Sequence, residues 1–368
     1  MRKNIFRNMD YGILICVVVL LAVSLVALYS ATQSTDYVEF RKQIIWICVS
    51  IPIMIVIIFI DYETIAKISP ILYGIVVLGL IAVLFTSPVN GATSWFNIGS
   101  VSIQPAEFAK IIVVIAVSYY MARVQEKNED DISRPTKLLK TLAIALLPIL
   151  LIIKQPDYGT AMAFIVAIIL MLFASGIKKR YIIGGILLVV IMVPVLYLFV
   201  LPEHAKTRID VFLNPDLDPR GAGYNVIQSK LAIGAGEFLG MGVLKGNQTQ
   251  LGFLYPKTTD FIFAVIGEEM GFVIAAVVII AYVILITRTA YIAKTAKDRL
   301  GAYIAMGIAG IFLFHMVENI GMTMGLLPIT GVPLPFVSYG GSSLMTNLIM
   351  VALLLNISGR RQKAIFVE

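Results

Sequence analysis

The chain has few of the residues that bind metals, form disulfides or carry charge. Its 368 residues include only two cysteines and two histidines, and 14% of them are charged. Cys16 and Cys48 lie in apolar runs that the topology below puts near opposite membrane faces, so we expect no disulfide. No cysteine and histidine cluster has the spacing of a zinc or iron site. The sequence also lacks a phosphate-binding loop and a dinucleotide fingerprint, which argues against nucleotide chemistry.

Long apolar runs dominate the chain instead. Hydrophobic residues make up 59% of it, and the mean hydropathy is +0.91, which is typical of membrane proteins. Lipid offers the backbone no hydrogen-bond partners, so segments that cross it must be helices. We therefore predict an all-α integral membrane protein, a single polytopic domain over residues 1–368. About ten transmembrane helices are expected, at roughly 12–32, 44–60, 68–87, 105–124, 138–154, 158–176, 181–201, 260–287, 301–326 and 337–358.

Three of these runs have features that go beyond their hydrophobicity. The basic start followed by an apolar run from about 13 to 31 resembles a signal peptide, but the run is too long, so we predict an uncleaved first span. Pro156 should end the fifth helix in a tight turn. The eighth run, at about 1.5 Å per residue, is longer than a bilayer is thick and should tilt or project.

Lysine and arginine predict the orientation. With a cytoplasmic N-terminus, nineteen of them lie in inside segments and nine outside, six of the nine in one long loop that translocates largely regardless of charge. We therefore predict that both termini are cytoplasmic. The large loop between spans seven and eight, about 202–259, is then extracytoplasmic, together with the Trp95-containing loop 87–99 and an uncharged Pro/Gly loop at 327–335. Most of the positive charge flanks the spans, so it does not indicate nucleic acid.

Asp260 stands where the long polar loop meets the eighth apolar run. A carboxylate at this depth is costly to keep, which makes it a functional candidate. It could equally cap the helix, and a capping carboxylate is held ionised by the helix N-terminus. Burial acts in the opposite direction and raises the pKa towards the range of a general base. The residues alone leave both roles open.

Two further charged groups lie at outer ends of spans. Glu107 and Lys110 are three residues apart after Pro105, so they share a helix face. They could form a structural ion pair or position an anion or a sugar. Asp157 follows Pro156 and could cap the sixth helix or belong to a site.

Deeper polar residues are interpreted mainly as a network between helices. Glu268 lies eight residues after Asp260, a little over two turns, so we expect it to share the face of Asp260, whereas Glu269 points elsewhere. His315, Glu318 and Asn319 form an i, i+3, i+4 stripe suited to interhelical hydrogen bonds. A metal site would need carboxylates from several spans to converge, so the metal ligands stay unknown.

The long loop is basic. Its positive charge could attract anionic lipid headgroups or bind a pyrophosphate-bearing lipid. A run at 224–233 is amphipathic and could lie along the membrane surface. The basic residues considered are Lys206, Arg208, Arg220, Lys230 and Lys257.

Several stretches together resemble the SEDS family of shape, elongation, division and sporulation proteins. The resemblance covers nearly the full length of the chain. The sequence Gly-Val-Pro-Leu-Pro at 331–335 is closer to the rod-shape elongation branch than to the division branch. The matching stretches are 104–110 (QPAEFAK), 155–160 (QPDYGT), 223–230 (GYNVIQSK), 259–269 (TDFIFAVIGEE) and 319–343 (NIGMTMGLLPITGVPLPFVSYGGSS).

The resemblance implies a peptidoglycan glycosyltransferase of the bacterial cytoplasmic membrane, with its active site facing outside. It would polymerise lipid II, an undecaprenyl-pyrophosphate disaccharide peptide, into glycan by inverting transfer, with Asp260 as the general base. Glu107, Lys110, Asp157, Arg208, Lys257, Ser338 and Ser342 would bind substrate or line its cavity. No cofactor is certain, although Mg or Mn could assist the leaving pyrophosphate. The expected protein partner is a class B penicillin-binding protein, a transpeptidase.

Two other functions remain open. A lipid II flippase would also use intramembrane charges and interrupted helices. A non-catalytic scaffold of the cell-wall synthesis complex would need only a partner surface.

Overall fold

The computed structural model describes residues 5–87, 93–99, 101–126, 128–195, 197–198, 203–214, 217–218 and 221–361. Arg220 and residues 88–92 of the Trp95-containing loop lie outside these ranges.

Each of the ten predicted runs corresponds to a helix, so the predicted fold class is confirmed. Among the described residues, eight helices are long and apolar enough to cross a membrane, and α7 is a shorter apolar helix. The chain is a multi-pass membrane protein. The ten helices are α2 (Tyr11–Ala31), α3 (Val38–Phe59), α4 (Tyr62–Val83), α5 (Pro105–Gln125), α6 (Pro135–Lys154), α7 (Tyr158–Ala174), α8 (Lys179–Val195), α12 (Ile262–Thr295), α13 (Arg299–Thr323) and α14 (Gly341–Gly359).

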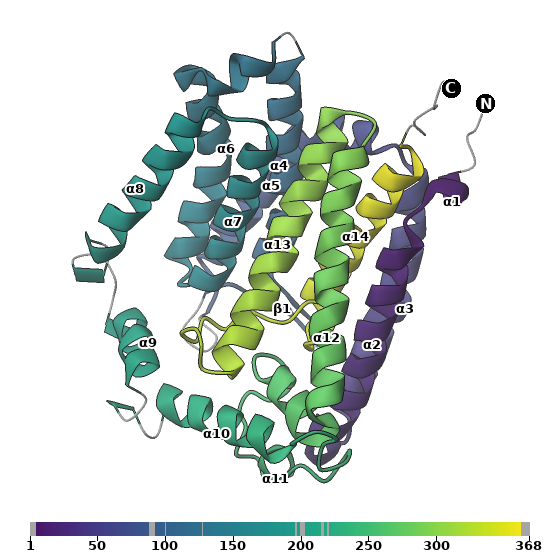
Figure 1. Cartoon of the computed structure of the whole chain (residues 1–368), viewed down its shortest axis with the longest axis vertical. Coiled ribbons are helices and arrows are strands. Elements are labelled where there is room, and N and C mark those ends of the chain that lie inside the picture. Colours follow the sequence, from purple (N-terminus) through teal and green to yellow (C-terminus); the bar gives the residue numbers. More distant parts are fainter. Residues whose placement is uncertain are drawn as a thin grey trace.

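Shorter elements decorate the two ends of this bundle. Both termini lie at one end, where α1 (Ile5–Asn8) precedes α2 (Figure 1). The long loop between α8 and α12 lies at the opposite end and contains α9 (Glu203–Leu213), α10 (Ala222–Ala235) and α11 (Asn247–Gln250). Two short strands, β1 (Phe96–Ile98) and β2 (Val101–Ile103), pair antiparallel just before α5. The remaining elements are the 3₁₀ turns η1 (Gln33–Thr35) and η2 (Glu129–Ser133).

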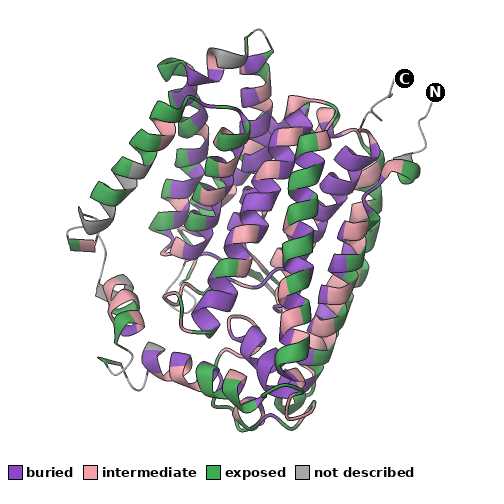
Figure 2. Ribbon diagram, in the orientation of Figure 1, coloured by how far each residue is buried: buried purple, intermediate pink, exposed green. Residues whose placement is uncertain are grey.

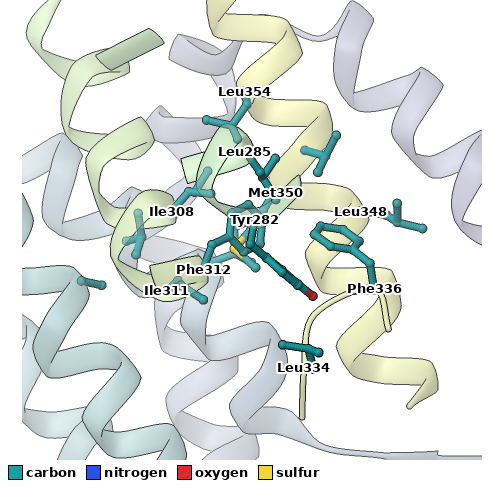
Figure 3. Packing of buried hydrophobic residues seen from close by; sticks show 14 of the residues in the cluster. Tyr282, Leu285, Ile308, Ile311, Phe312, Leu334, Phe336, Leu348, Met350 and Leu354 are labelled. Atoms are coloured by element: carbon teal, nitrogen blue, oxygen red, sulfur yellow. The ribbon is translucent and has the colours of Figure 1, made fainter. Parts of the chain in front are cut away.

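The most buried helices are α13 and α14. In their most apolar windows 72% and 78% of residues are buried, against 17% in α3, so α3 lies at the periphery (Figure 2). Side chains from α12, α13 and α14 meet in a core where Tyr282, Phe312 and Met350 pack together (Figure 3). The Tyr282 hydroxyl donates to the Pro335 carbonyl, which fixes the segment before α14 against this core.

The long helix α12 is broken, which the sequence did not predict. Gly271 has φ 73° and ψ −176°, so α12 consists of a short first segment and a longer second one instead of a single tilted rod. The loop at 237–242 supplies the missing partners: Met241 N donates to Glu268 O at 2.9 Å, and Phe272 N donates to Glu237 O at 2.9 Å. The break therefore leaves the backbone satisfied, as the membrane requires.

We expect Gly271→Ala to destabilise the protein strongly. A side chain strains this positive φ, and its β-carbon would lie 2.2 Å from Gly240 N. Thermal unfolding of the detergent-solubilised variant should shift down by several degrees, roughly 2 kcal/mol or more. Gly74→Ala is the matched control, because Gly74 lies inside α4 with nothing within 4 Å of an added β-carbon. Equal unfolding temperatures for the two variants would contradict the role of the break.

Candidate active site

The Pro/Gly loop at 327–335, here called the Pro loop, passes between Asp260 and the start of α7. A β-carbon at Gly331 would lie 3.6 Å from Asp260 Oδ2, so this glycine faces the carboxylate. On the other side, a β-carbon at Gly159 of α7 would lie 2.2 Å from Val332 Cγ2. The Pro loop thus brings the neighbourhood of Asp157 close to Asp260.

The polar stripe of α13 holds the Pro loop in place. His315 Nδ1 lies 2.9 Å from Pro333 O, and Thr330 Oγ1 donates to Glu318 Oε1 at 2.8 Å. Asn319 Nδ2 donates both to Val332 O at 2.8 Å and to the backbone oxygen of Asp260 at 3.0 Å. One buried amide therefore fixes the Pro loop and Asp260 to each other.

The predicted pair of Glu107 and Lys110 forms a buried ion pair. Lys110 Nζ lies 2.9 Å from Glu107 Oε2, and both side chains are almost completely inaccessible. Lys110 Nζ also lies 3.1 Å from His315 Nε2. An ammonium can only donate, so Nε2 accepts and Nδ1 carries the proton that is given to Pro333 O. A chain of polar contacts therefore connects α5, α13 and the Pro loop.

Asp157 caps α7 and also contacts the segment before α5. Its Oδ1 accepts from Thr160 N at 3.1 Å and its Oδ2 accepts from Gln104 Nε2 at 2.9 Å. Burial raises the pKa of Asp157, and the hydrogen bonds from Thr160 partly oppose this. The carboxylate is both a cap and part of the polar cluster, so the two roles weighed above coexist.

Gln104 is a contact residue that the sequence reasoning missed. It precedes Pro105 at the start of α5, its side chain contacts Asp157, and its backbone N–H donates to Ser342 Oγ at 3.3 Å. The only signal for it is its place at the head of the 104–110 motif. Thr330 was missed in the same way, inside the longest motif.

Asp260 lies just outside α12, half-buried in the turn that precedes Ile262. Burial raises its pKa to about 6, while the hydrogen bond from Thr259 and the charge of Arg208 act in the opposite direction. Arg208 on α9 also donates from Nη1 to Ile329 O at 3.4 Å, which places the guanidinium beside the Pro loop. A carboxylate with this pKa is largely ionised at neutral pH and can still accept a proton.

The other predicted cation of this region, Lys257, faces a different cluster. Its Nζ donates to Thr249 O at 2.9 Å, and burial lowers its pKa while Glu269 and Glu39 raise it. The charge that acts on Asp260 is therefore that of Arg208, whereas Lys257 is engaged with the segment around α11.

Glu268 and Glu269 bind this same segment. Glu268 accepts from Gln248 N at 2.6 Å and Thr249 N at 2.9 Å, and Glu269 accepts from Gly246 N at 3.3 Å. The prediction that Glu268 shares the face of Asp260 assumes that the helix already includes Asp260. Because α12 begins at Ile262, the helical spacing between the two residues does not hold. Both glutamates instead fix α11 and its flanks to the broken helix.

The two predicted serines hold backbone segments around the site. Ser338 Oγ donates to Thr259 O at 2.7 Å and accepts from Leu334 N at 2.8 Å, so it joins the Pro loop to the residue before Asp260. Ser342 accepts from Gln104 N and lies 3.4 Å from Ser102 O of the hairpin. Their hydroxyls orient the chain around Asp260 and Glu107.

The described carboxylates of the site do not gather into a complete set of metal ligands. Among the residues that the structure describes, no three His, Cys, Asp or Glu side chains gather as metal ligands. Magnesium sites often use one or two carboxylates and complete the shell with substrate phosphates and water. Asp260 and Glu318, both beside the Pro loop, are oxygen donors of that kind.

A family model described as a cell cycle protein, covering FtsW, RodA and SpoVE, matches residues 2–363. The chain belongs to this family. It is 36% identical over 360 residues to the peptidoglycan glycosyltransferase MrdB of Escherichia coli, covering 96% of this chain and 95% of the relative. It is 37% identical to a probable peptidoglycan glycosyltransferase FtsW of Trichlorobacter lovleyi, covering 96% of this chain and 94% of the relative. The identities to the relative named MrdB and to the relative named FtsW are therefore similar, so assignment to the RodA branch stays a prediction.

Solved structures show the same fold. A chain of a peptidoglycan synthase complex that coordinates polymerization and crosslinking matches with a TM-score of 0.82 and 26% identity, covering 95% of this chain and 97% of that one. RodA of Thermus thermophilus matches with a TM-score of 0.72 and 24% identity, covering 96% and 98%. The helix arrangement described above is thus the FtsW/RodA membrane fold.

Proposed function

We propose that this protein is a peptidoglycan glycosyltransferase that polymerises lipid II into glycan strands. The single observation that carries the proposal is Asp260, a half-buried carboxylate with a pKa of about 6, held beside the Pro loop by Asn319. Near full-length relatives named peptidoglycan glycosyltransferase support it. The described residues contain no nucleotide motif, which agrees with a substrate that brings its own pyrophosphate leaving group.

Asp260 acts as the general base in this proposal. It accepts the proton of the acceptor sugar's 4-hydroxyl while that oxygen attacks the anomeric carbon of the donor. The new glycosidic bond forms as the bond to the pyrophosphate oxygen breaks, and the electron pair leaves with undecaprenyl pyrophosphate. One displacement turns an α-linked donor into a β-linked product, so no covalent nucleophile is needed.

Arg208 is the cation best positioned for the leaving pyrophosphate. Its guanidinium contacts the Pro loop and its charge acts on Asp260, so it lies beside the reacting groups. Planar guanidinium groups bind phosphate oxygens through two parallel hydrogen bonds. Glu318, beside the Pro loop, would supply an oxygen ligand to a divalent cation, Mg or Mn, which would add positive charge at the pyrophosphate and leave Asp260 free as the base.

The ion pair of Glu107 and Lys110 and the cap residue Asp157 support the same cavity. Lys110 is tied to the Pro loop through His315, whose Nδ1 lies against Pro333 O. Gln104 ties Asp157 to Ser342 at the start of α14. Lys257 is assigned a supporting role around α11 in place of direct pyrophosphate binding.

We place the reaction at the outer face of the bacterial cytoplasmic membrane, with both termini inside. The start of α12, which Asp260 closely precedes, lies at the end of the bundle opposite the termini (Figure 1). The lysine and arginine count favours the termini as cytoplasmic. The similar chain from a synthase complex for polymerization and crosslinking supports a class B penicillin-binding protein as partner. The Gly-Val-Pro-Leu-Pro sequence of the Pro loop favours a role in elongation and cell shape.

We expect Asn319→Leu to slow polymerisation about tenfold or more with little change in KM, because Asp260 loses the donor that fixes its backbone. Asn356→Leu is the matched control: Asn356 is equally buried and donates to Ile57 O at 2.6 Å, at the end of the bundle that carries the termini. Both variants should lose thermal stability, but only Asn319→Leu should lose kcat per folded molecule. A similar loss of kcat in both would reduce Asn319 to a purely structural residue.

The proposal is tested with the purified protein in liposomes that contain lipid II. Glycan strands resolved on a gel are the expected product. A second assay follows fluorescent lipid II across the bilayer, since a flippase is the competing function. Scrambling without polymer would establish the flippase and overturn the proposal, and neither activity, with or without a cognate transpeptidase and Mg or Mn, would favour a scaffold.

A further inference from the structure

A polar cavity of about 510 Å³ lies far from Asp260, at the end of the bundle that carries both termini. It opens between the start of α2 and the late turns of α12, next to the end of α14. Its polar side chains are those of Asp10, Tyr11, Thr287, Arg288, Tyr291 and Arg361, and Met9 and Gly12 complete the lining. None of these residues takes part in the active site proposed above.

The wall formed by Asp10 is rigid. Its side chain accepts from Gly12 N at 3.1 Å, and its backbone N–H donates to Ser358 Oγ of α14 at 3.2 Å. Arg288 Nη1 lies 3.6 Å from Asp10 Oδ2, and a β-carbon at Gly12 would lie 3.2 Å from Arg288 Nε. The absent side chain of Gly12 lets the guanidinium lie against the start of α2.

The cavity combines two guanidinium groups with one carboxylate, so its lining carries net positive charge. The contact of Arg288 with Asp10 is long, the Arg288 side chain is 52% exposed, and Arg288 lines the cavity. The neighbouring Arg360 is instead bound to Asp61 and Asn356, so Arg361 is the terminal arginine that lines the cavity. Two guanidinium groups around one cavity are a typical phosphate-binding arrangement.

An apolar strip leads away from this cavity along both helices. Ile15 and Val18 follow Tyr11 by four and seven residues on α2, and both are exposed. On α12, Ile284 and Ile280 precede Arg288 by four and eight residues and are exposed as well. The alkyl chains of a lipid whose phosphate is bound at the cavity could therefore lie along α2 and α12.

We propose that this cavity binds the headgroup of an anionic phospholipid. Arg288 and Arg361 hold the phosphate, Asp10 accepts hydrogen bonds from headgroup hydroxyls such as those of a glycerol, and the acyl chains follow the apolar strip. Basic pockets between membrane helices on the cytoplasmic side bind anionic headgroups by the same chemistry. The strip distinguishes a lipid from a free phosphate ion, which would use the arginines alone.

The test is lipid binding to the purified full-length protein in a non-ionic detergent, followed by native mass spectrometry. Titration with phosphatidylglycerol should show one site that Arg361→Gln weakens about fivefold and Arg288→Gln/Arg361→Gln weakens further. Arg361→Gln leaves the contact of Arg288 with Asp10 intact, so it reports on the ligand without disturbing the helix pairing. Arg180→Gln on α8 is the matched control, because Arg180 is an exposed arginine that lies outside the cavity, over the ring of Tyr181.

Two further arms separate the possible ligands. Phosphatidylethanolamine, which is zwitterionic, should bind at least about fivefold more weakly than phosphatidylglycerol. Inorganic phosphate and glycerol 3-phosphate should raise the unfolding temperature less than the lipid does at equal concentration. Equal binding of phosphatidylglycerol by wild type and the double variant, or phosphate binding as tight as lipid binding, would overturn the proposal.

Discussion

The Asp260→Asn protein should bind lipid II but polymerise it at least about 100-fold more slowly than wild type. The amide keeps the size of the side chain and cannot accept the proton of the attacking hydroxyl. It also removes an ionised group whose pKa burial raises to about 6. Because the pKa is higher in the folded than in the unfolded protein, wild-type stability falls as the pH rises from about 4 to about 6, and the full loss persists at pH 7.5. The variant lacks this charge, so it should be at least as stable as wild type at pH 7.5.

The measurement compares polymerisation rates, lipid II affinity and unfolding temperature for the same preparations. Asp36→Asn is the control, since Asp36 is an exposed carboxylate in the link between α2 and α3, at the same end of the bundle. It should polymerise at the wild-type rate. A polymerisation rate for Asp260→Asn within a few-fold of wild type would show that another group is the base.

The second large effect is expected at the buried ion pair. Lys110→Met leaves Glu107 without its cation and His315 without its donor, so it should lower the free energy of unfolding by about 3–5 kcal/mol. Glu107→Gln in the same chain removes the uncompensated charge, so the double variant should be more stable than Lys110→Met alone. The expected coupling energy is roughly 1–3 kcal/mol.

Unfolding in mild detergent, followed by tryptophan fluorescence, measures both quantities. Lys297→Met is the matched control, because Lys297 pairs with Glu63 at the same distance of 2.9 Å, but both side chains are about 40% exposed. Its loss should be below about 1 kcal/mol. If Lys110→Met cost no more than Lys297→Met, or if the double variant lost the sum of the single losses, the pair would not act as a buried unit.

The spans were predictable from sequence because their signal is local. An apolar run of sufficient length must be a helix in lipid, and all ten runs are. Their starts were less accurate: α3 and α4 begin at Val38 and Tyr62, six residues earlier than predicted, because charged residues in their first turns hide the helix from an apolar count. The hairpin before α5 escaped prediction for a similar reason, since its strands have three residues each.

The break in α12 depends on a distant segment. Gly271 lies inside the predicted eighth run with no proline or other local signal for a break, and glycine is common in membrane helices. The loop at 237–242 fixes its conformation. This loop donates hydrogen bonds to the carbonyls of Glu268 and Glu269 and accepts them from the N–H groups of Phe272 and Val273. No local pattern reports such a contact, so the sequence predicted one long helix.

The candidate site was found residue by residue but not as an arrangement. Charged residues within or next to apolar spans are costly and therefore easy to recognise as candidates. This criterion identifies Asp260, Glu107, Lys110 and Asp157. Their partners come from other spans: Lys110 meets His315, 205 residues away. Lys257, a basic residue of the long loop, is predicted to bind substrate, whereas its ammonium binds the segment at α11.

The central claim is that Asp260 removes the proton during glycan extension, and the pH dependence of polymerisation tests it most directly. Initial rates at limiting lipid II, measured on the purified protein from pH 5 to pH 8, should rise with pH and reach half of their plateau near pH 6, where Asp260 ionises. Below that value the rate should fall about tenfold per pH unit, and the residual rate of Asp260→Asn should lack this step. A wild-type rate that is unchanged across this range, or a step that persists in Asp260→Asn, would contradict the assignment.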